Sequence, residues 1–247
     1  EFSQPDTAQA MGAWIAEKTG GFLHPTLDID DSTVMSIVNT VWYKSQWAYQ
    51  FDAAETTTGD FTTDSGEVVQ AEYMHKTFEQ SIGFQTEEYT KGEIAMSIGH
   101  MVFVLPQEGV DVDSLLTEEK LWEIFGRSDY DSADMVWSIP KFETTVTYSL
   151  GEALTDLGVT SAFSDSADFS GISDTPLFVS QVRQGTHISL NEDGVEAAAY
   201  TDLLLAGAGA PEEVPTIEMN LNRPFIYMIT SRDGSPLFIG VVRDPAA

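Results

Sequence analysis

The amino-acid sequence predicts an α+β fold. Apolar runs of strand length recur along the chain, and only a few segments have helical spacing. The two kinds of segment do not alternate in the βαβ rhythm of a parallel sheet. The chain has 247 residues, of which 42% are hydrophobic, so it can bury a sizeable core in one large domain or two modest ones.

The first half of the chain is predicted to contain one helix followed by strands. Asp6 can cap a helix that runs through Trp14 and ends at Gly20-Gly21. An apolar strand with few charges is expected over residues 34–47. The rest of this half is predicted to hold turns and short strands over 51–73 and an apolar strand over 96–105 that Pro106 closes.

The second half is predicted to alternate short helices with longer strands. Helical spacing appears over 113–125, and a short helix over 148–157 is ended by Gly158. Strands are expected from 135 onward and over 177–190. The last two strands, 224–230 and 236–242, are joined by a turn with an Asp-Gly pair, which indicates a β-hairpin.

Composition excludes several classes of function. The chain has 40 acidic and 11 basic residues and a net charge of −29, so it repels phosphate backbones and anionic lipid. The acidic residues are interspersed with apolar ones, which is typical of a folded chain rather than an acidic tail. There is no cysteine, so disulfides, thiolate catalysis and cysteine-based zinc sites are excluded.

No cofactor, metal site or enzyme activity is predicted. The four histidines, at positions 24, 75, 100 and 187, lack the spacing of metal ligands, and neither a Gly-x-Ser-x-Gly elbow nor a phosphate-binding glycine loop is present. No apolar stretch approaches the roughly 20 residues of a membrane span. The first residues show no signal peptide, and the missing initiator Met indicates that the natural N-terminus lies further upstream.

Residues 191–222 do not fit the pattern of ordinary strands and helices. Every second residue from Val195 to Leu205 is small or apolar, whereas the alternate positions carry Glu196 and Asp202. This period of two predicts a strand with one buried face, although an alanine-rich helix fits the composition equally well. Residues 206–210 are only Gly and Ala, a stretch flexible enough to enter a protease cleft. A loop this long within a compact domain is either functional or disordered.

Six blocks of sequence, in order and with consistent spacing, resemble the serpin family of serine protease inhibitors. The resemblance implies a multi-sheet fold with a large central β-sheet and helices, and it favours the strand interpretation of the loop. We expect residues 1–247 to form a single serpin domain, the C-terminal two-thirds of the family domain. The family's N-terminal helices would precede Glu1, and either a separate chain supplies them or the protein has been truncated. The blocks are residues 39–47 with Phe51, residues 139–142 with 148–150 and 154–158, and residues 167–173, 191–199, 222–226 and 238–245.

The resemblance implies suicide-substrate trapping of a serine protease. In this family the protease attacks an exposed loop, here residues 194–215, and forms a covalent acyl complex. The loop then inserts into the main sheet as a strand. The family's count from the hinge glycine implies cleavage between Ala208 and Gly209, and a small residue there suits elastase-like proteases. The hinge residues implied are Gly194, Val195, Glu196, Ala197, Ala198 and Ala199.

The resemblance also implies a sheet-opening region made of Asn39, Gln184, Lys141 and Glu192. Lys141 and Glu192 match an ion pair where the loop starts to insert, although two unrelated surface charges would also explain them. Asn39 matches a polar residue under the opening. Its usual histidine partner is replaced by Gln184, which can still form a hydrogen bond with an amide.

Two other functions stay open: a non-inhibitory carrier, chaperone or storage relative, and a cleaved inactive fragment. The intact run Ala197-Ala198-Ala199 favours inhibition, because non-inhibitory relatives tend to lose small hinge residues. The absence of cysteine and the strong acidity indicate a bacterial source. We expect secretion, because an inhibitor meets its proteases outside the cell.

Overall fold

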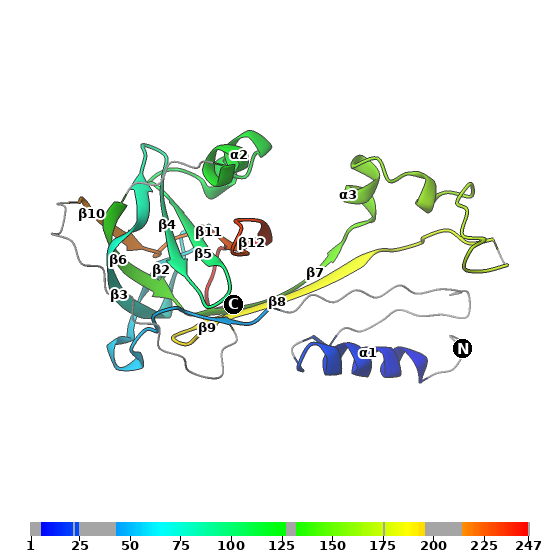
Figure 1. The fold of residues 1–247 in the computed structure, drawn as a ribbon, viewed down its shortest axis with the longest axis horizontal. Helices are drawn as coiled ribbons and strands as arrows, with labels where there is room; N and C mark the ends of the chain where they lie inside the picture. The colour runs from blue at the N-terminus through cyan, green and yellow to red at the C-terminus, as the bar shows by residue number, and fades with distance from the viewer. Residues whose placement is uncertain are drawn as a thin grey trace. The chain divides into compact units, whose positions relative to one another are not determined.

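The computed structural model describes residues 6–21, 23–24, 43–126, 132–174, 176–195 and 214–246 (Figure 1). These residues belong to two compact units. The first unit comprises Glu1–Trp42 and Thr144–Ile188, and the second comprises Tyr43–Glu143 and Ser189–Ala247. The expectation of a single domain over 1–247 stays a prediction.

The first unit contains the predicted N-terminal helix and a second short one. Helix α1 (Thr7–Lys18) begins after Asp6, as expected, but the Asp6 side chain accepts no capping hydrogen bond. Gly20 and Gly21 follow the helix with positive φ angles, 64° and 91°. The other helices among the described residues of this unit are α3 (Gly151–Asp156) and the 3₁₀-helix η3 (Ser161–Phe163).

The second unit is built on an eight-stranded sheet with the order β10-β6-β3-β4-β5-β11-β12, and β2 pairs with β3 beside this path. All the neighbouring pairs are antiparallel except β10 and β6, which are parallel. The strands are β2 (Thr57–Thr62), β3 (Val68–Gln85), β4 (Tyr89–Ala95), β5 (His100–Pro106), β6 (Ser132–Pro140), β10 (Thr216–Asn220), β11 (Phe225–Thr230) and β12 (Pro236–Val242).

A four-stranded sheet carries the start of the predicted loop. Its order is β1-β9-β8-β7. Strand β9 directly follows the turn after β8 and pairs antiparallel with both β8 and β1. The strands are β1 (Ser45–Gln46), β7 (Phe142–Ser149), β8 (Arg183–Asn191) and β9 (Gly194–Val195).

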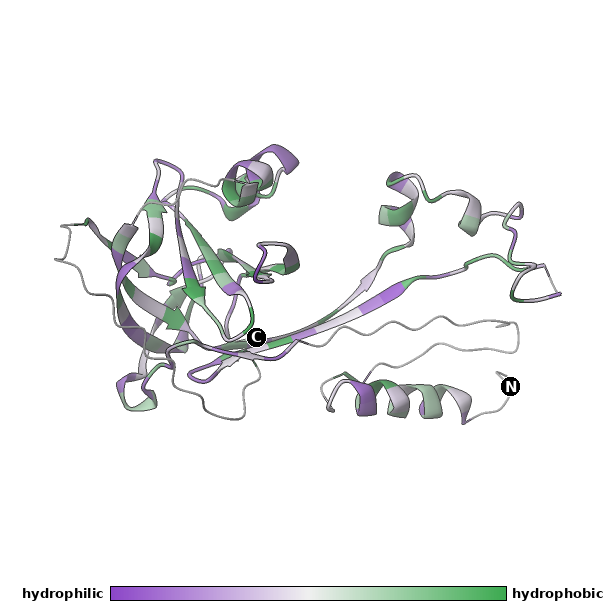
Figure 2. Cartoon of the chain, in the orientation of Figure 1, coloured by the Kyte–Doolittle hydropathy of each residue, from purple (hydrophilic) through white to green (hydrophobic). Residues whose placement is uncertain are grey.

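The core of the second unit lies against the central strands of the eight-stranded sheet. Every residue of β11 is buried, and so is every residue of β5 after His100, as the continuous apolar sequence of these strands requires. The ring of Phe103 lies 5.6 Å from that of Trp137 and 6.1 Å from that of Phe225. Such aromatic contacts add to the stabilisation from burial alone. Figure 2 shows hydrophobic residues concentrated along these strands.

The structure confirms the C-terminal hairpin. Strands β11 and β12 pair antiparallel, and the turn between them is closed by hydrogen bonds from Ser231 N to Ser235 O (2.9 Å) and from Gly234 N to Ser231 O (3.1 Å). The strand predicted from residue 135 is also confirmed as β6. Only the end of the strand predicted over 34–47 is described, and it contains β1.

Two predicted segments have different bounds in the structure. The strand expected over 96–105 begins only at His100, because a turn closed by Met96 N to Gly99 O (3.0 Å) separates it from β4. The helix expected over 113–125 is split into the 3₁₀-helix η2 (Val112–Leu115) and α2 (Glu118–Gly126). The Oδ1 atom of Asp111 caps the first, and Thr117 Oγ1 accepts from Lys120 N at the start of the second.

Three further segments also differ from expectation. The helix expected over 148–157 starts at Gly151, because Tyr148 belongs to β7. The strand expected over 177–190 starts at Arg183. Strand β10, within the segment treated as a loop, was not predicted. It forms because its backbone pairs with β6 and becomes the edge of the sheet, from Thr216 opposite Asp134 to Asn220 opposite Ser138.

Candidate functional site

The turn between β8 and β9 is held against the chain near β1 by three hydrogen bonds to its backbone carbonyl groups. The indole Nε1 of Trp47 donates to Asn191 O (2.9 Å), the backbone N of Trp47 donates to Asp193 O (3.1 Å), and Phe51 N donates to Glu192 O (3.2 Å). Trp47 is 3% exposed and its ring packs edge-on against Phe51, so the residue that donates two of these bonds is itself buried and packed.

Gly194 enters β9 in a conformation that requires glycine. Its φ is 138°, a region that L side chains rarely adopt. A Cβ atom there would meet the backbone of β1, with Gln46 Cα at 2.7 Å and Trp47 N at 2.9 Å. Val195 follows and is 2% exposed, opposite both Leu190 and Ser45. The first position of the predicted small-residue face is therefore buried within the sheet.

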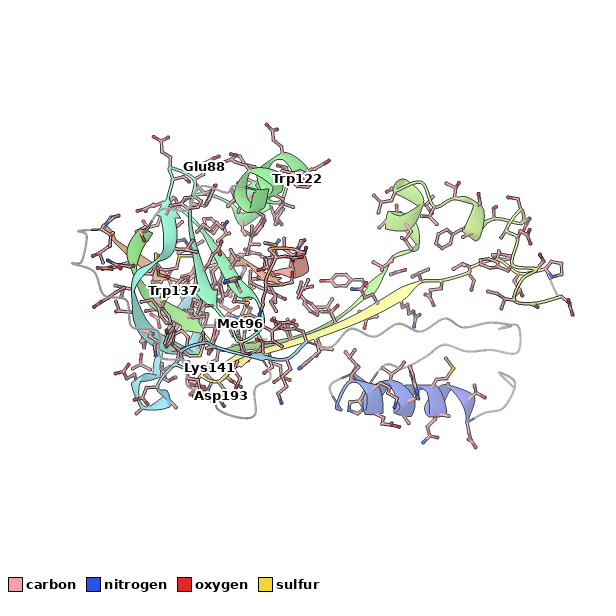
Figure 3. All side chains as sticks on the ribbon, viewed as in Figure 1. Glu88, Met96, Trp122, Trp137, Lys141 and Asp193 are labelled. Carbon is pink, nitrogen blue, oxygen red and sulfur yellow. The ribbon has the colours of Figure 1, made fainter. Side chains whose placement is uncertain are left out.

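Lys141 joins two acidic residues beside this turn. Its Nζ lies 3.4 Å from Glu192 Oε1 and 3.3 Å from Glu72 Oε2. Glu192 Oε1 also accepts a hydrogen bond from Thr56 Oγ1 (2.8 Å). Figure 3 labels Lys141 and, on the turn, Asp193. The structure thus brings Lys141 and Glu192 together as an ion pair and adds Glu72, which the sequence analysis did not identify.

The pairing shifts the pKa values of Lys141 and Glu192. Burial acts to lower the pKa of Lys141, but hydrogen bonds and attraction from Glu72 and Glu192 outweigh it, so the pKa is raised. Burial acts to raise the pKa of Glu192, but its backbone N–H, Thr56 and Lys141 stabilise the carboxylate, so the pKa is lowered. Both side chains are held in their charged forms.

The described residues include part of the predicted site. Gly194, Val195, Lys141 and Glu192 meet around one turn, whereas Gln184 is exposed on β8 in the first unit. The predicted residues that lie outside the described part of the chain are Asn39, Glu196, Ala197, Ala198, Ala199, Ala208 and Gly209. The contact of Asn39 with Gln184, the bait bond and most of the hinge stay predictions.

Trp47, Thr56 and Glu72 were not recognised as parts of the site. Trp47 stands in the first resemblance block, so its place beside the loop had a signal in the sequence. Glu72 had none. It reaches Lys141 because β3 and β6 pair with Tyr73 opposite Pro140, and Lys141 N donates to Glu72 O (2.8 Å).

The part of the chain that the structure describes was searched for clustered metal ligands and for helices that could span a membrane. These residues contain no group of three or more histidine or acidic side chains placed to hold an ion. No helix among them is both long and apolar enough to cross a membrane. A cavity of about 360 Å³ has Arg223, Arg243 and Asp111 in its lining, but Arg243 is already paired with Asp64 and Asp113.

Comparison with known proteins decides the family. Residues 1–245 match the family described as serpin (serine protease inhibitor). This chain belongs to the serpin family. The family acts on proteases as an inhibitor and is not a family of enzymes.

Serpins of two animals are similar to this chain. An alpha-1-antitrypsin homolog of Cyprinus carpio is 31% identical over 253 residues, covering 99% of this chain and 66% of that protein. Alpha-1-antiproteinase S of Cavia porcellus is 29% identical over 253 residues, covering 99% of this chain and 60% of that protein. The chain therefore spans about three fifths to two thirds of the length of these relatives.

Solved serpin structures confirm the α+β serpin fold. Thyroxine-binding globulin in complex with thyroxine superposes with a TM-score of 0.80 at 28% identity, covering 100% of this chain and 67% of that one. The thermophilic serpin tengpin in its native state superposes with a TM-score of 0.78 at 29% identity, covering 98% of this chain and 64% of that one.

Proposed function

We propose that this serpin inhibits serine proteases by suicide-substrate trapping, with residues 194–215 as the reactive-centre loop. The serine hydroxyl of the protease attacks the carbonyl carbon of Ala208. The peptide bond to Gly209 breaks, Gly209 leaves as a new amino terminus, and Ala208 stays bound to the protease as an ester. The freed loop then inserts as a strand and carries the protease with it.

The observation that carries this proposal is the position of β9. Strand β9 pairs with β8 on one side and with β1 on the other, through Val195 opposite both Leu190 and Ser45. The chain that follows Val195 can extend this strand in the same register, with main-chain hydrogen bonds on both sides. Each aliphatic side chain buried like Val195 would stabilise the inserted form by roughly 1.5–3 kcal/mol.

The anchored turn supports the same mechanism. Trp47 and Phe51 hold the three carbonyl groups of residues 191–193, so the strand is extended from a fixed point rather than from a loose end. The ion pair with Lys141 also holds the side chain of Glu192, which belongs to this turn. We propose that Asn39 and Gln184 act with this pair as the sheet-opening region.

The target class follows from the predicted bait bond. Ala208 is small, so we propose an elastase-like protease with a shallow specificity pocket. A bacterial source stays a prediction that rests on the acidity and the lack of cysteine. Secretion stays a prediction that rests on the expectation that an inhibitor meets its proteases outside the cell.

The test uses the protein in its full natural length with an elastase-like serine protease. A denaturing gel should show a stable complex at the summed mass, and mass spectrometry should find a released peptide that begins at Gly209. Ala208→Arg should transfer inhibition to a trypsin-like protease. Ala197→Glu should permit cleavage but prevent the complex, because a charge would enter the buried face of the strand. Clean cleavage of the unaltered protein without any complex would refute trapping.

A non-inhibitory carrier is the second candidate, and one comparison favours it. Thyroxine-binding globulin, which by its name binds thyroxine, superposes on this chain with a TM-score of 0.80. A carrier would be cleaved at the loop without forming a complex. A cleaved inactive fragment would differ from both, because its loop could not be cut again.

A further inference from the structure

The cavity of about 360 Å³ lies wholly within the second unit. Its volume falls within the roughly 300–1,000 Å³ of small-molecule sites. Its walls come from the turn between β2 and β3, residues 109–113 at the start of η2, the connection from β10 to β11, and the residue after β12. Thr62 N donates to Asn222 O (2.9 Å), which joins the first of these walls to the third. Contacts inside the described chain therefore hold the cavity together.

Arg223 brings a positive charge to the lining that no carboxylate pairs with. A guanidinium group has five N–H donors. Among the described residues, Nε (3.0 Å) and Nη2 (2.7 Å) donate to Pro106 O, and Nη1 donates to Asn222 Oδ1 (3.0 Å). Burial lowers the pKa of Arg223, although the charge of Glu108 acts to raise it. The other N–H donors are left for an anionic group of a ligand.

Asp111 brings a negative charge that is also without an ion pair among the described residues. Its Oδ1 accepts a hydrogen bond from Asp113 N (3.0 Å), which caps η2. Arg243 differs, because it is paired with both Asp64 and Asp113 and so adds no unpaired positive charge. The lining thus offers an anion site at Arg223 and a cation site at Asp111.

These charges select the class of ligand. A simple anion meets three carboxylates in the lining and a chain of net charge −29, so it is repelled. A simple cation meets the guanidinium group of Arg223 in the same cavity. A molecule that carries both charges satisfies Arg223 and Asp111 together. Val110, Val112 and Pro224 also line the cavity and offer apolar contacts to its carbon atoms.

We propose that this cavity binds a small zwitterion with one ammonium and one carboxylate group, such as a free amino acid, whose carboxylate pairs with Arg223 and whose ammonium group pairs with Asp111. The inference goes beyond the proposed inhibition and does not depend on it. Binding is measured without a protease, so the failure of either proposal leaves the other standing.

Ligand-observed NMR titration of the protein in its full natural length tests the proposal, with free L-alanine as the probe. Propionate and ethylammonium are matched controls, because each carries only one of the two charges of alanine. Alanine should bind at least about tenfold more tightly than either control, since it alone makes both charge-assisted contacts. Equal binding of propionate would mean an anion site and equal binding of ethylammonium a cation site. Either result, or no binding of alanine, would overturn the proposal.

A matched pair of variants separates the cavity from the charge of the whole chain. Asp111→Asn should weaken alanine binding at least about tenfold while it keeps the cap of η2, because Asn caps as well as Asp. The control is Asp52→Asn. Asp52 is also exposed and caps a 3₁₀-helix, η1 (Ala53–Glu55), through a bond from Ala54 N to its Oδ1 (2.9 Å), but it lies outside the lining. The control should bind alanine like the unaltered protein. An equal loss in both variants would mean that only net charge matters and would refute the site.

The spacing of the two ligand charges gives a second test. Glycine, β-alanine and 4-aminobutyrate place the ammonium and carboxylate groups at increasing separations. Arg223 and Asp111 are held by their own hydrogen bonds, so binding should be tightest at one separation. The same affinity for all three would indicate diffuse attraction to the surface and would contradict a site with two fixed charges.

Discussion

Gly194→Ala should destabilise this serpin more than a usual glycine replacement. Gly194 has a φ of 138°, and residues other than glycine lose about 1–3 kcal/mol in such conformations. Its new Cβ would also lie within 3 Å of Gln46 Cα and Trp47 N. These are backbone atoms of the paired segment, so no side-chain rotation relieves the overlap, and β9 must move away from β1.

The cost of that movement follows from what β9 buries. Separation would expose Val195, which is 2% exposed, at about 1.5–3 kcal/mol. It would also weaken the bond from Trp47 N to Asp193 O, at about 0.5–1.5 kcal/mol. Together with the backbone strain, the free energy of unfolding should fall by about 3–7.5 kcal/mol, a large share of the 5–15 kcal/mol typical of a folded protein.

Urea unfolding, followed by tryptophan fluorescence, measures this loss. Gly66→Ala is the matched control, because Gly66 has a φ of 81° but a Cβ there would meet no atom within 4 Å. This control should lose only about 1–2 kcal/mol from its left-handed backbone. If Gly194→Ala lost no more than Gly66→Ala, the clash with β1 would be irrelevant and β9 would not be fixed as described.

Three further substitutions test the second unit. Glu192→Gln should lower the free energy of unfolding by about 1 kcal/mol at neutral pH. The pKa of Glu192 is lowered from about 4.5, so the stabilisation by its carboxylate is present above that pH and is lost as the pH falls through the lower folded pKa. Urea midpoints of the variant and the unaltered protein at neutral and acidic pH measure this, and a difference between the two proteins that does not shrink at acidic pH would contradict the ion pair. Arg243→Gln should cost under about 1 kcal/mol, because Arg243 and its two aspartate partners are all exposed, and about 1 M salt should reduce that loss in the same assay. Gly92→Ala should cost about 1–3 kcal/mol, because its Cβ would lie 2.7 Å from Trp137 Cη2, and near-ultraviolet circular dichroism should change with it; an unchanged spectrum and midpoint would contradict this packing.

The ordered blocks of sequence were enough to predict the family and the fold. Local elements followed from local sequence: Asp233-Gly234 predicted the hairpin of β11 and β12, and the apolar residues around Trp137 predicted β6. The pairing of Lys141 with Glu192 came from the resemblance, since periodicity alone cannot bring two such distant residues together.

Tertiary structure decided the features that depend on strand register. Glu72 reaches Lys141 only because β3 and β6 pair as they do, and nothing in the sequence around Glu72 marks it. The turn at Gly99 separates β4 from β5 within one apolar run, which a pattern of hydrophobicity cannot divide. The sequence around Gly194 does not mark this residue either, because the requirement for glycine arises from the backbone of β1 beside it. Turn and period are properties of neighbouring residues, whereas register is fixed by burial summed over whole strands, so only the folded chain determines which distant side chains meet.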